Sequence, residues 1–192
     1  MRKAFCESLV NKSSHKEFVF LTGDLGFMAL EPLRTAMKDR FINAGISEQN
    51  MVSVAAGLAK SNLRPWAYSI APFIYARPFE QIRNDVCLHS LPVILVGNGG
   101  GYGYGVMGAT HHSLEDYGAL LTLPGMRTFI PAFDEDINPM VDILFKVNHP
   151  CYLRLGVTEL PKDFQLPEYN SWRKLLDGDG ATLVVVGPLV GS

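Results

Sequence analysis

Residues 41–59 read FINAGISEQNMVSVAAGLA, and this stretch contains a strand, a tight turn and a helix in succession. Its apolar start is typical of a buried strand, and Gly45 marks the turn. The helix expected over 47–61 opens with Ser47 and Glu48, two residues that can act simply as caps for the free N–H groups of the first helical turn. Small residues further along this helix allow close contact with another backbone, which favours a helix buried in an interface.

Strand-like and helix-like segments alternate on both sides of this stretch. Apolar strand-like runs lie at 17–22, 41–44, 66–70, 92–97, 127–131 and 151–155, and helical patterns lie at 2–12, 31–38, 47–61, 76–89, 113–122 and 134–147. Several of the strand-like runs lack regular alternation, which is typical of strands covered on both faces. The pattern predicts an α/β fold, namely a parallel sheet of about six strands with helices on both faces.

The alternation ends after the last of these strands. Residues 157–180 contain prolines and a DGDG run, and they read as a linker. ATLVVVG at 181–187 has the composition of one more buried strand, but no helical pattern follows it. We therefore expect a main domain over 1–156, then the linker, and at 181–192 the first strand of a second domain that is cut off.

The bulk composition narrows the classes of function. The net charge is −2 with no basic run, which argues against a nucleic-acid or membrane-surface partner. The three cysteines are widely spaced and odd in number, which suits buried free thiols in a reducing compartment and no metal site. No apolar run reaches about 18 residues and no signal-peptide pattern opens the chain, so we expect a cytoplasmic protein without a membrane span.

Ligands of open parallel sheets bind beside the carboxyl ends of the strands, so the loops that follow the strands are the places to search for chemistry. The loop after 92–97 contains GYGVMG at 103–108, which fits the pattern G-x-G-x-x-G. A dinucleotide site needs these glycines directly after the strand and at the start of a helix. Here they lie in the middle of a loop, so the segment does not predict dinucleotide binding.

Six segments of the chain resemble one family. RFINAGISEQNMVSVAAGLA at 40–59 is similar to the signature of the pyrimidine-binding domain of transketolase-like thiamine diphosphate enzymes. The similarity extends to TGDLG (22–26), YARPFEQIRND (75–85), LPVILVGNGGG (91–101), GATHHSLEDYGALLTLPGM (108–126) and PCYLRLG (150–156). This family includes transketolase, 1-deoxyxylulose-5-phosphate synthase and the beta subunits of 2-oxoacid dehydrogenases. The resemblance covers residues 1–156 and implies the thiamine diphosphate-binding fold.

The resemblance implies a catalytic and cofactor-binding role for Glu48. In the family, the Glu at this position contacts N1′ of the cofactor's aminopyrimidine and favours the tautomer that removes the proton from C2 of the thiazolium ring. Such a carboxyl group works best in a dry pocket, where its hydrogen bond is strong. The family also stacks the pyrimidine on an aromatic side chain, for which Phe73 is preferred over Tyr75. Asp24 is a further cofactor-site candidate, and Asp24 and Glu80 are candidates for orienting loops or crossing a subunit interface.

The resemblance also implies substrate contacts. His111 matches the family's active-site His, which contacts a substrate oxygen and can move protons, while His112 is the alternative if the dehydrogenase beta subunits are the better match. Arg154 matches a phosphate-binding Arg, whose planar fork suits phosphate, and a salt bridge to a carboxylate at the sheet edge is the structural alternative. One residue departs from the pattern: Met107 stands where sugar-transferring transketolases carry an Asp that binds a substrate hydroxyl.

The family binds the diphosphate and Mg²⁺ of the cofactor on a separate domain that we do not find in these residues. The expected protein is therefore the pyrimidine-binding part of a thiamine diphosphate-dependent transferase that moves a two-carbon ketol unit between sugar phosphates. It would act as a homodimer or as a heteromer with a diphosphate-binding subunit. Two other functions remain open at this point: a beta subunit of a 2-oxoacid dehydrogenase, and a non-catalytic scaffold derived from the family.

Overall fold

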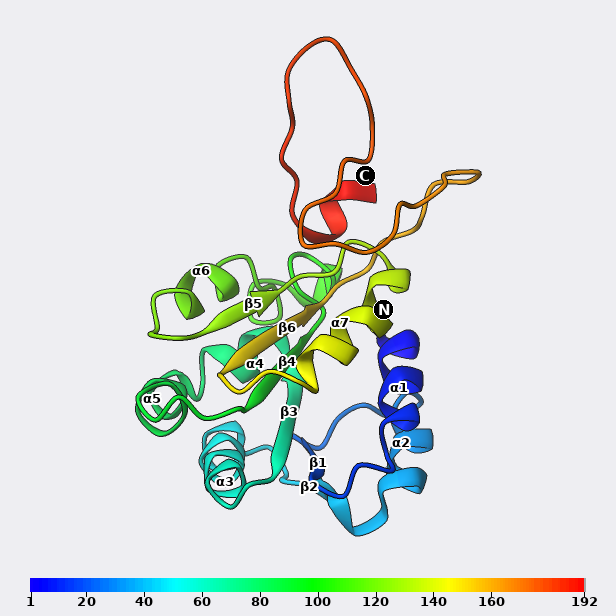
Figure 1. The fold of residues 1–192 in the computed structure, drawn as a ribbon. Helices are drawn as coiled ribbons and strands as arrows, with labels where there is room; N and C mark the ends of the chain where they lie inside the picture. Colours follow the sequence, from blue (N-terminus) through cyan, green and yellow to red (C-terminus); the bar gives the residue numbers. More distant parts are fainter. Residues whose placement is uncertain (192) are drawn as a thin grey trace.

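A single six-stranded sheet organises the computed structural model, which describes residues 1–191. The strands are β1 (Phe18–Thr22), β2 (Phe41–Asn43), β3 (Arg64–Ile70), β4 (Ile94–Asn98), β5 (Arg127–Phe129) and β6 (Cys151–Leu155). They lie in the order β2-β1-β3-β4-β6-β5, and every neighbouring pair is parallel (Figure 1). The predicted α/β fold with a parallel sheet is confirmed.

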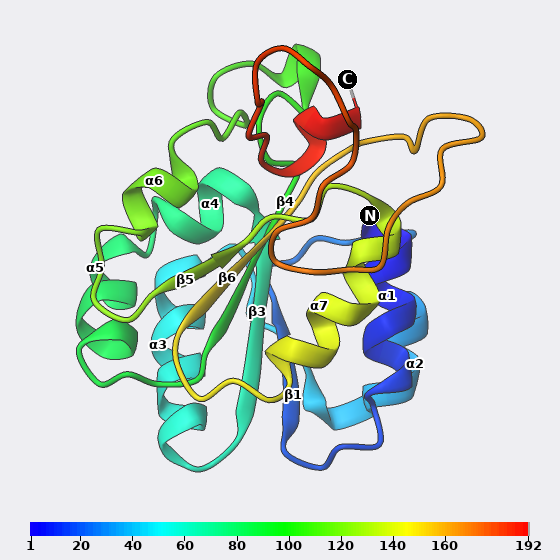
Figure 2. The same ribbon diagram turned by 45° about the horizontal axis from the view of Figure 1, so that its top comes forward.

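Helices cover both faces of the sheet (Figure 2). One layer consists of α1 (Arg2–Asn11), α2 (Glu31–Met37) and α7 (Ile137–Leu144), and the other of α3 (Glu48–Lys60), α4 (Ala71–Tyr75), α5 (Phe79–Gln81) and α6 (Asp116–Leu120). Short 3₁₀ turns are η1 (Lys38–Arg40), η3 (Gly105–Met107), η4 (Asp134–Asp136) and η5 (Gly187–Gly191), and η2 (Ile82–Cys87) is a π-helical turn.

The burial of the strands explains their sequences. All five residues of β1 and the first four of β4 are buried, so both faces of these strands are apolar. The strands at the two edges, β2 and β5, have only three residues each and are less buried. Short edge strands leave little unpaired backbone for another chain to pair with.

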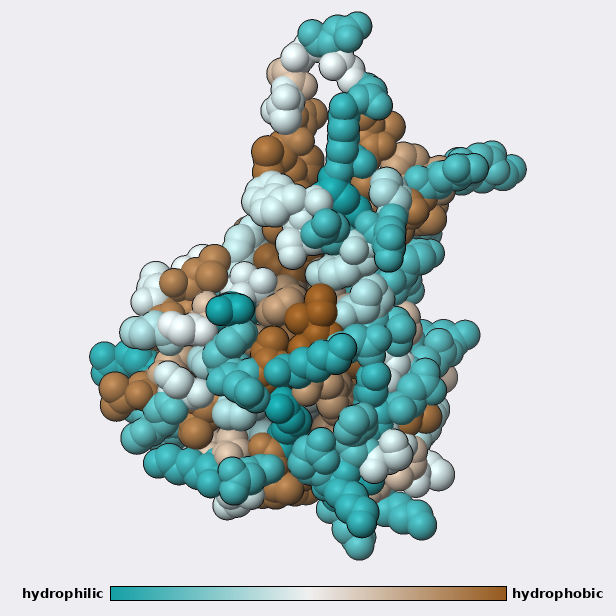
Figure 3. Space-filling view, viewed as in Figure 1, coloured by the Kyte–Doolittle hydropathy of each residue, from teal (hydrophilic) through white to brown (hydrophobic). Residues whose placement is uncertain are grey.

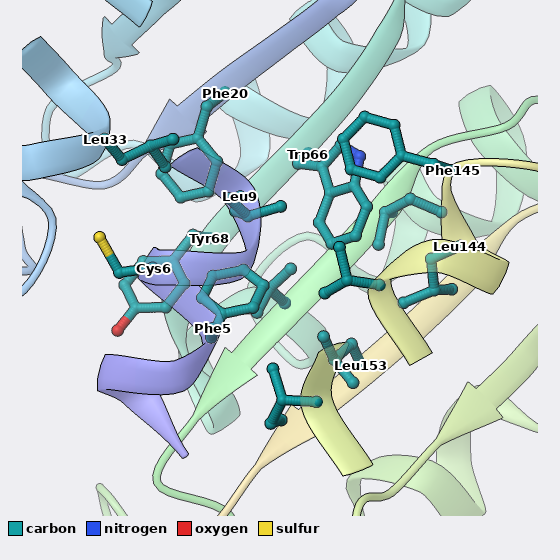
Figure 4. Close-up of a cluster of buried hydrophobic side chains, with 14 of the residues drawn as sticks. Phe5, Cys6, Leu9, Phe20, Leu33, Trp66, Tyr68, Leu144, Phe145 and Leu153 are labelled. Atoms are coloured by element: carbon teal, nitrogen blue, oxygen red, sulfur yellow. The ribbon is translucent and has the colours of Figure 1, made fainter. Parts of the chain in front are cut away.

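An aromatic cluster fills the space between the sheet and the layer of α1, α2 and α7 (Figure 4). The ring of Phe5 on α1 lies 6.1 Å from the rings of both Trp66 and Tyr68 on β3. Phe18 meets Phe145 edge to face at 5.0 Å. Each large apolar side chain buried in this way contributes about 1.5–3 kcal/mol of transfer free energy. The cluster fixes β3, the strand whose carboxyl end leads into the candidate site.

The helix predicted over 76–89 forms over 79–87, where α5 runs directly into the π-helical turn η2, and a separate short helix, α4, precedes it. α4 ends at Tyr75 and α5 begins at Phe79, with Pro78 between them. Proline has no N–H group to donate, and its ring clashes with the preceding helical turn, so one helix does not run through this position. The break leaves 71–77 as a separate short turn at the carboxyl end of β3.

The strand predicted at 181–187 does not form. Residues 157–186 contain no helix or strand, and Leu183 is 83% exposed. The C-terminal part of this segment forms the open loop at the top of Figure 1. The physical reason is that a strand needs a neighbouring strand for its N–H and C=O groups, and nothing in residues 1–191 pairs with this segment. The division into domains therefore stays a prediction.

Contacts of Tyr169 and Arg173 help to tie this C-terminal segment to the sheet domain. Tyr169 packs against the aromatic cluster. Arg173 lies 2.8 Å from the buried carboxylate of Asp136, which also accepts hydrogen bonds from the backbone of Ala132 and Phe133. The rest of the loop is open, and Figure 3 shows brown, apolar side chains on it.

Within the described residues, none of the helices combines the length and the apolar character needed to cross a lipid bilayer.

The thiols of Cys6, Cys87 and Cys151 are free and buried. Burial raises the pKa of Cys87 to about 11 and that of Cys151 to about 12, because apolar surroundings disfavour the thiolate. We expect iodoacetamide at about pH 8 to leave all three thiols unmodified in the folded chain and to label them in guanidinium, because the thiolate is the reactive form. Mass spectrometry gives the count, and rapid labelling of a native thiol would contradict the burial.

Candidate functional site

The candidate residues lie at or just after the carboxyl ends of β1, β2, β3, β4 and β6, along the same end of the sheet. Gly45, at φ +72°, turns the chain from β2 into α3, and its N–H donates to the side-chain oxygen of Asn43 at 3.0 Å. This left-handed conformation favours glycine. Gly23, after β1, borders the carboxylate of Glu48, because a Cβ there would lie at ordinary contact distance, 3.4 Å, from Oε1 of Glu48.

Glu48 is the first residue of α3, and its side chain is buried, with 3% exposed. Oε1 accepts a hydrogen bond from the hydroxyl of Ser69 at 3.0 Å, and Oε2 accepts one from Nη1 of Arg77 at 2.8 Å. Ser47 occupies the N-cap position, yet its side chain makes no capping bond. Ser47 therefore does not cap the helix through its side chain, and the carboxylate of Glu48 points toward β3 and the turn that follows it.

Phe73 and Tyr75, the two aromatic candidates, have different surroundings. Phe73 is partly exposed, and the guanidinium carbon of Arg77 lies 3.6 Å from the centroid of its ring. Tyr75 is buried in the core, and its hydroxyl donates to Glu115 at 2.7 Å. Burial raises the pKa of Tyr75, and the same hydrogen bond lowers that of Glu115. Arg77 thus connects Phe73 with Glu48, and the geometry favours Phe73 over Tyr75 as the stacking residue.

The two adjacent histidines, His111 and His112, also have different surroundings. The ring of His111 lies 5.2 Å from that of Phe73, edge to face, and its Nδ1 is 3.0 Å from the hydroxyl of Thr110. His112 faces the other way: its Nε2 lies 2.8 Å from the carbonyl oxygen of Gly105. A carbonyl only accepts, so His112 donates from Nε2 and holds the glycine-rich loop at 99–112 that follows β4, here called the glycine loop. Only His111 joins the group around Phe73.

Asp24 follows β1 and lines a hollow of about 240 Å³. It is exposed, adopts φ +57°, and accepts a hydrogen bond from the side-chain amide of Asn43 at 2.8 Å. This bond links the ends of β1 and β2 and supports the expectation that Asp24 orients a loop. Glu80 is exposed on α5. Cofactor or interface contacts of either residue stay predictions.

Arg154 on β6 is largely buried and already has partners. Its Nε lies 3.2 Å from the carboxylate of Asp116, which is fully buried, and Nη2 donates to the carbonyl oxygen of Ser113. The hydroxyl of Tyr152 donates to the same carboxylate at 2.6 Å, and burial raises the pKa of Tyr152 well above its usual value. This geometry matches the salt-bridge alternative, and phosphate binding by Arg154 stays a prediction.

A cavity of about 440 Å³ borders Arg154, between the glycine loop and the C-terminal segment. It is lined by Tyr102, Leu114, Tyr117 and Leu189 together with backbone of the glycine loop. The guanidinium carbon of Arg154 lies 5.1 Å from the centroid of the Tyr117 ring, at one wall of this cavity.

Three important side chains were missing from the sequence-based candidates: Ser69, Arg77 and Asp116. Arg77 stands within the recognised segment YARPFEQIRND, but its spacing gives no sign of an ion pair with a residue 29 positions earlier. Ser69 is one polar residue in an apolar strand, and a polar residue in a buried strand is the only signal that could have pointed to it. Among residues 1–191, no cluster of His, Cys, Asp and Glu is placed to hold a metal ion.

Comparison with known proteins gives the same family as the sequence motifs. The family model "Transketolase, pyrimidine binding domain" matches residues 3–162. The chain is 32% identical over 195 aligned residues to an apulose-4-phosphate transketolase subunit of Phocaeicola vulgatus, with 98% of this chain and 62% of that protein covered. The corresponding protein from Actinobacillus succinogenes is 34% identical over 69% of this chain and 43% of its own length. The chain therefore spans less than two thirds of either relative.

Solved structures of transketolases share the fold of this chain. A split-gene transketolase described as an inactive beta4 tetramer matches with a TM-score of 0.74 and 32% identity, over 88% of this chain and 54% of that one. Transketolase from Leishmania mexicana has a TM-score of 0.72 at 21% identity, over 81% of this chain and 25% of its own, which supports the fold alone. Since the family model accounts for 3–162 and the sheet has this fold, the chain belongs to the transketolase pyrimidine-binding domain family.

Proposed function

We propose that this chain is the pyrimidine-binding part of a thiamine diphosphate-dependent transketolase that moves a two-carbon ketol unit between sugar phosphates. The observation that carries the proposal is the buried carboxylate of Glu48, joined through Arg77 to the ring of Phe73, with His111 next to that ring. The relatives from Phocaeicola vulgatus and Actinobacillus succinogenes are transketolase subunits, which favours ketol transfer over the 2-oxoacid dehydrogenase and scaffold alternatives.

The residues present fit an aminopyrimidine ring. Glu48 offers a carboxylate oxygen that faces Phe73 through Arg77, and Ser69 fixes the other oxygen. Gly23 keeps the wall beside Oε1 of Glu48 free of a side chain. A buried acceptor that makes a strong hydrogen bond, next to a flat apolar face, suits a planar ring with polar nitrogens.

Thiamine diphosphate, when bound, supplies the electron sink that ketol transfer needs. Glu48 would bind and orient the pyrimidine through a ring nitrogen, and Phe73 would hold the ring flat. His111, whose Nδ1 is engaged by Thr110, has Nε2 left to contact a substrate oxygen and to exchange a proton with it. The exposed Met107 carries only a thioether, which is a weak acceptor for a substrate hydroxyl.

We further propose that a partner subunit or a second chain supplies the diphosphate and Mg²⁺ site. Exposed apolar side chains stand in the loops that follow the strands: Phe27, Met28, Ile46 and Val106. Scattered apolar residues are normal on a surface, but several in loops around one site indicate a face that another protein covers. A cytoplasmic location is part of this proposal.

The test is reconstitution. We expect calorimetry to find no thiamine diphosphate binding at micromolar levels by these 192 residues alone, and ketol transfer after co-expression with a diphosphate-binding transketolase subunit. Apulose 4-phosphate is the first substrate to assay, because two relatives are named for it. Analytical ultracentrifugation would report the complex. Micromolar binding by the isolated chain, or a stable complex without ketol transfer from any sugar phosphate tried, would contradict the proposal.

A further inference from the structure

The guanidinium of Arg77 fills the space between Glu48 and Phe73. Nη1 lies 2.8 Å from Oε2 of Glu48, and the guanidinium carbon lies 3.6 Å from the centroid of the Phe73 ring. The carboxylate is 3% exposed and the arginine side chain 42%, so Arg77 covers the carboxylate from the solvent side. One side chain therefore makes both contacts that the proposed function assigns to the aminopyrimidine.

The guanidinium of Arg77 and an aminopyrimidine share the features that this position requires, namely a flat shape and a hydrogen-bonding edge. A guanidinium is flat, donates from N–H groups along its edge, and stacks on aromatic faces. An aminopyrimidine is also flat, carries a hydrogen-bonding edge, and stacks in the same way. A group at stacking distance from Phe73 and in hydrogen-bond contact with Glu48 leaves no room for a second group between them.

We propose that Arg77 is a placeholder that occupies the pyrimidine position in the cofactor-free chain and withdraws when the pyrimidine binds. The inference rests on the proposed function, since that function assigns the pyrimidine to Glu48 and Phe73. A buried carboxylate without a partner is costly, so the ion pair protects Glu48 until the cofactor is present. Its position explains how Arg77 can withdraw, because the partly exposed guanidinium can move into solvent without crossing the core.

The placeholder lowers the apparent affinity for the pyrimidine. Binding requires the state in which Arg77 has withdrawn, and apparent affinity falls by the fraction of chains in that state. Removing the guanidinium removes this competition. Arg77→Met keeps an unbranched apolar stem beside Phe73 and deletes the charge and the N–H donors.

The test uses the full chain and the free pyrimidine half of the cofactor, 4-amino-5-hydroxymethyl-2-methylpyrimidine, which needs no diphosphate site. We expect calorimetry to show about tenfold tighter binding to Arg77→Met than to the unsubstituted chain. Arg83→Met is the matched control, because Arg83 is an exposed arginine of the neighbouring π-helical turn, and its binding should equal that of the unsubstituted chain.

A second readout follows Arg77 directly. Protons that lie over the face of an aromatic ring resonate upfield, so the Arg77 side-chain protons should shift upfield in the free chain. They should return toward ordinary positions as the pyrimidine is added. The spectrum of the Phe73→Leu variant should lack the upfield shift from the start, which identifies its source.

Each outcome decides the inference. Tighter binding by Arg77→Met, together with loss of the upfield shift on titration, supports the placeholder. Weaker binding by Arg77→Met would show that the arginine is a ligand contact, and unchanged or undetectable binding would show that its removal opens no pyrimidine site. Either of the last two results overturns the inference, while the proposed function is judged separately by ketol transfer in the reconstituted complex.

Discussion

Ketol transfer by the reconstituted complex is expected to fall by about 100-fold or more in the Glu48→Gln variant, the usual range for loss of a positioned acid–base group. Glutamine has nearly the same shape as glutamate and can keep the hydrogen bond with Ser69. It cannot carry the proton or the charge at the oxygen that now faces Arg77. The substitution therefore removes the chemistry of the group while leaving its place in the fold.

The matched control is Ser47→Ala. Ser47 is the N-cap of α3 and precedes Glu48, but its side chain makes no capping hydrogen bond, so its removal should leave transfer and stability nearly unchanged. Steady-state rates of both variants, with circular dichroism to check folding, separate the two roles of this helix start. A Glu48→Gln enzyme with near-normal turnover would show that the carboxylate only supports the helix.

The fold could be predicted from the sequence because its strands are covered on both faces. Continuous apolar runs such as 17–22 and 92–97 leave few alternatives to a buried parallel strand, and the helices between them fix the crossover connections. The position of Glu48 could be predicted for a related reason: a carboxylate at the start of an apolar helix, after a glycine turn, lies at the carboxyl edge of the sheet. Its role toward the cofactor comes from the family resemblance and stays a prediction.

Sequence periodicity could not decide between neighbouring candidates, and the preferences for His111 and Phe73 come from the family resemblance alone. His111 and His112, like Phe73 and Tyr75, differ by one or two positions in segments without a regular period. In such segments each side chain's direction depends on individual backbone dihedrals, which a sequence pattern does not specify. The structure separates them through contacts with distant residues, including the bond between Tyr75 and Glu115.

The strand predicted at 181–187 does not form, although the sequence favours it. Its valines and leucine have high strand propensity, but propensity describes how a residue fits a pleated surface that is already there. No strand within residues 1–191 lies beside this segment, so the backbone stays unpaired and the side chains stay exposed. The ion pair of Arg173 with Asp136 fixes the loop that leads to it but supplies no pairing edge.

Below the candidate site, a buried network joins the helix after the glycine loop to β6. The carboxylate of Asp116 is fully buried and accepts a hydrogen bond from the hydroxyl of Tyr152 at 2.6 Å. It also lies 3.2 Å from Nε of Arg154. Arg154 has 11% of its side chain exposed, so water offers it little solvation. A network of this kind holds its members in one geometry but depends on every charge being paired.

The Asp116→Ala variant is expected to lose about 3–5 kcal/mol of unfolding free energy, because it leaves the guanidinium of Arg154 buried without its counter-charge. Urea unfolding followed by circular dichroism measures the loss. Glu115→Ala is the matched control: it removes the adjacent, exposed carboxylate and its bond from Tyr75, which costs about 0.5–1.5 kcal/mol. Replacing Asp116 and Arg154 together by Leu and Met should recover most of the loss, since no charge is then left unpaired. If Asp116→Ala unfolds at the same urea concentration as Glu115→Ala, the buried ion pair is not what fixes β6 to α6.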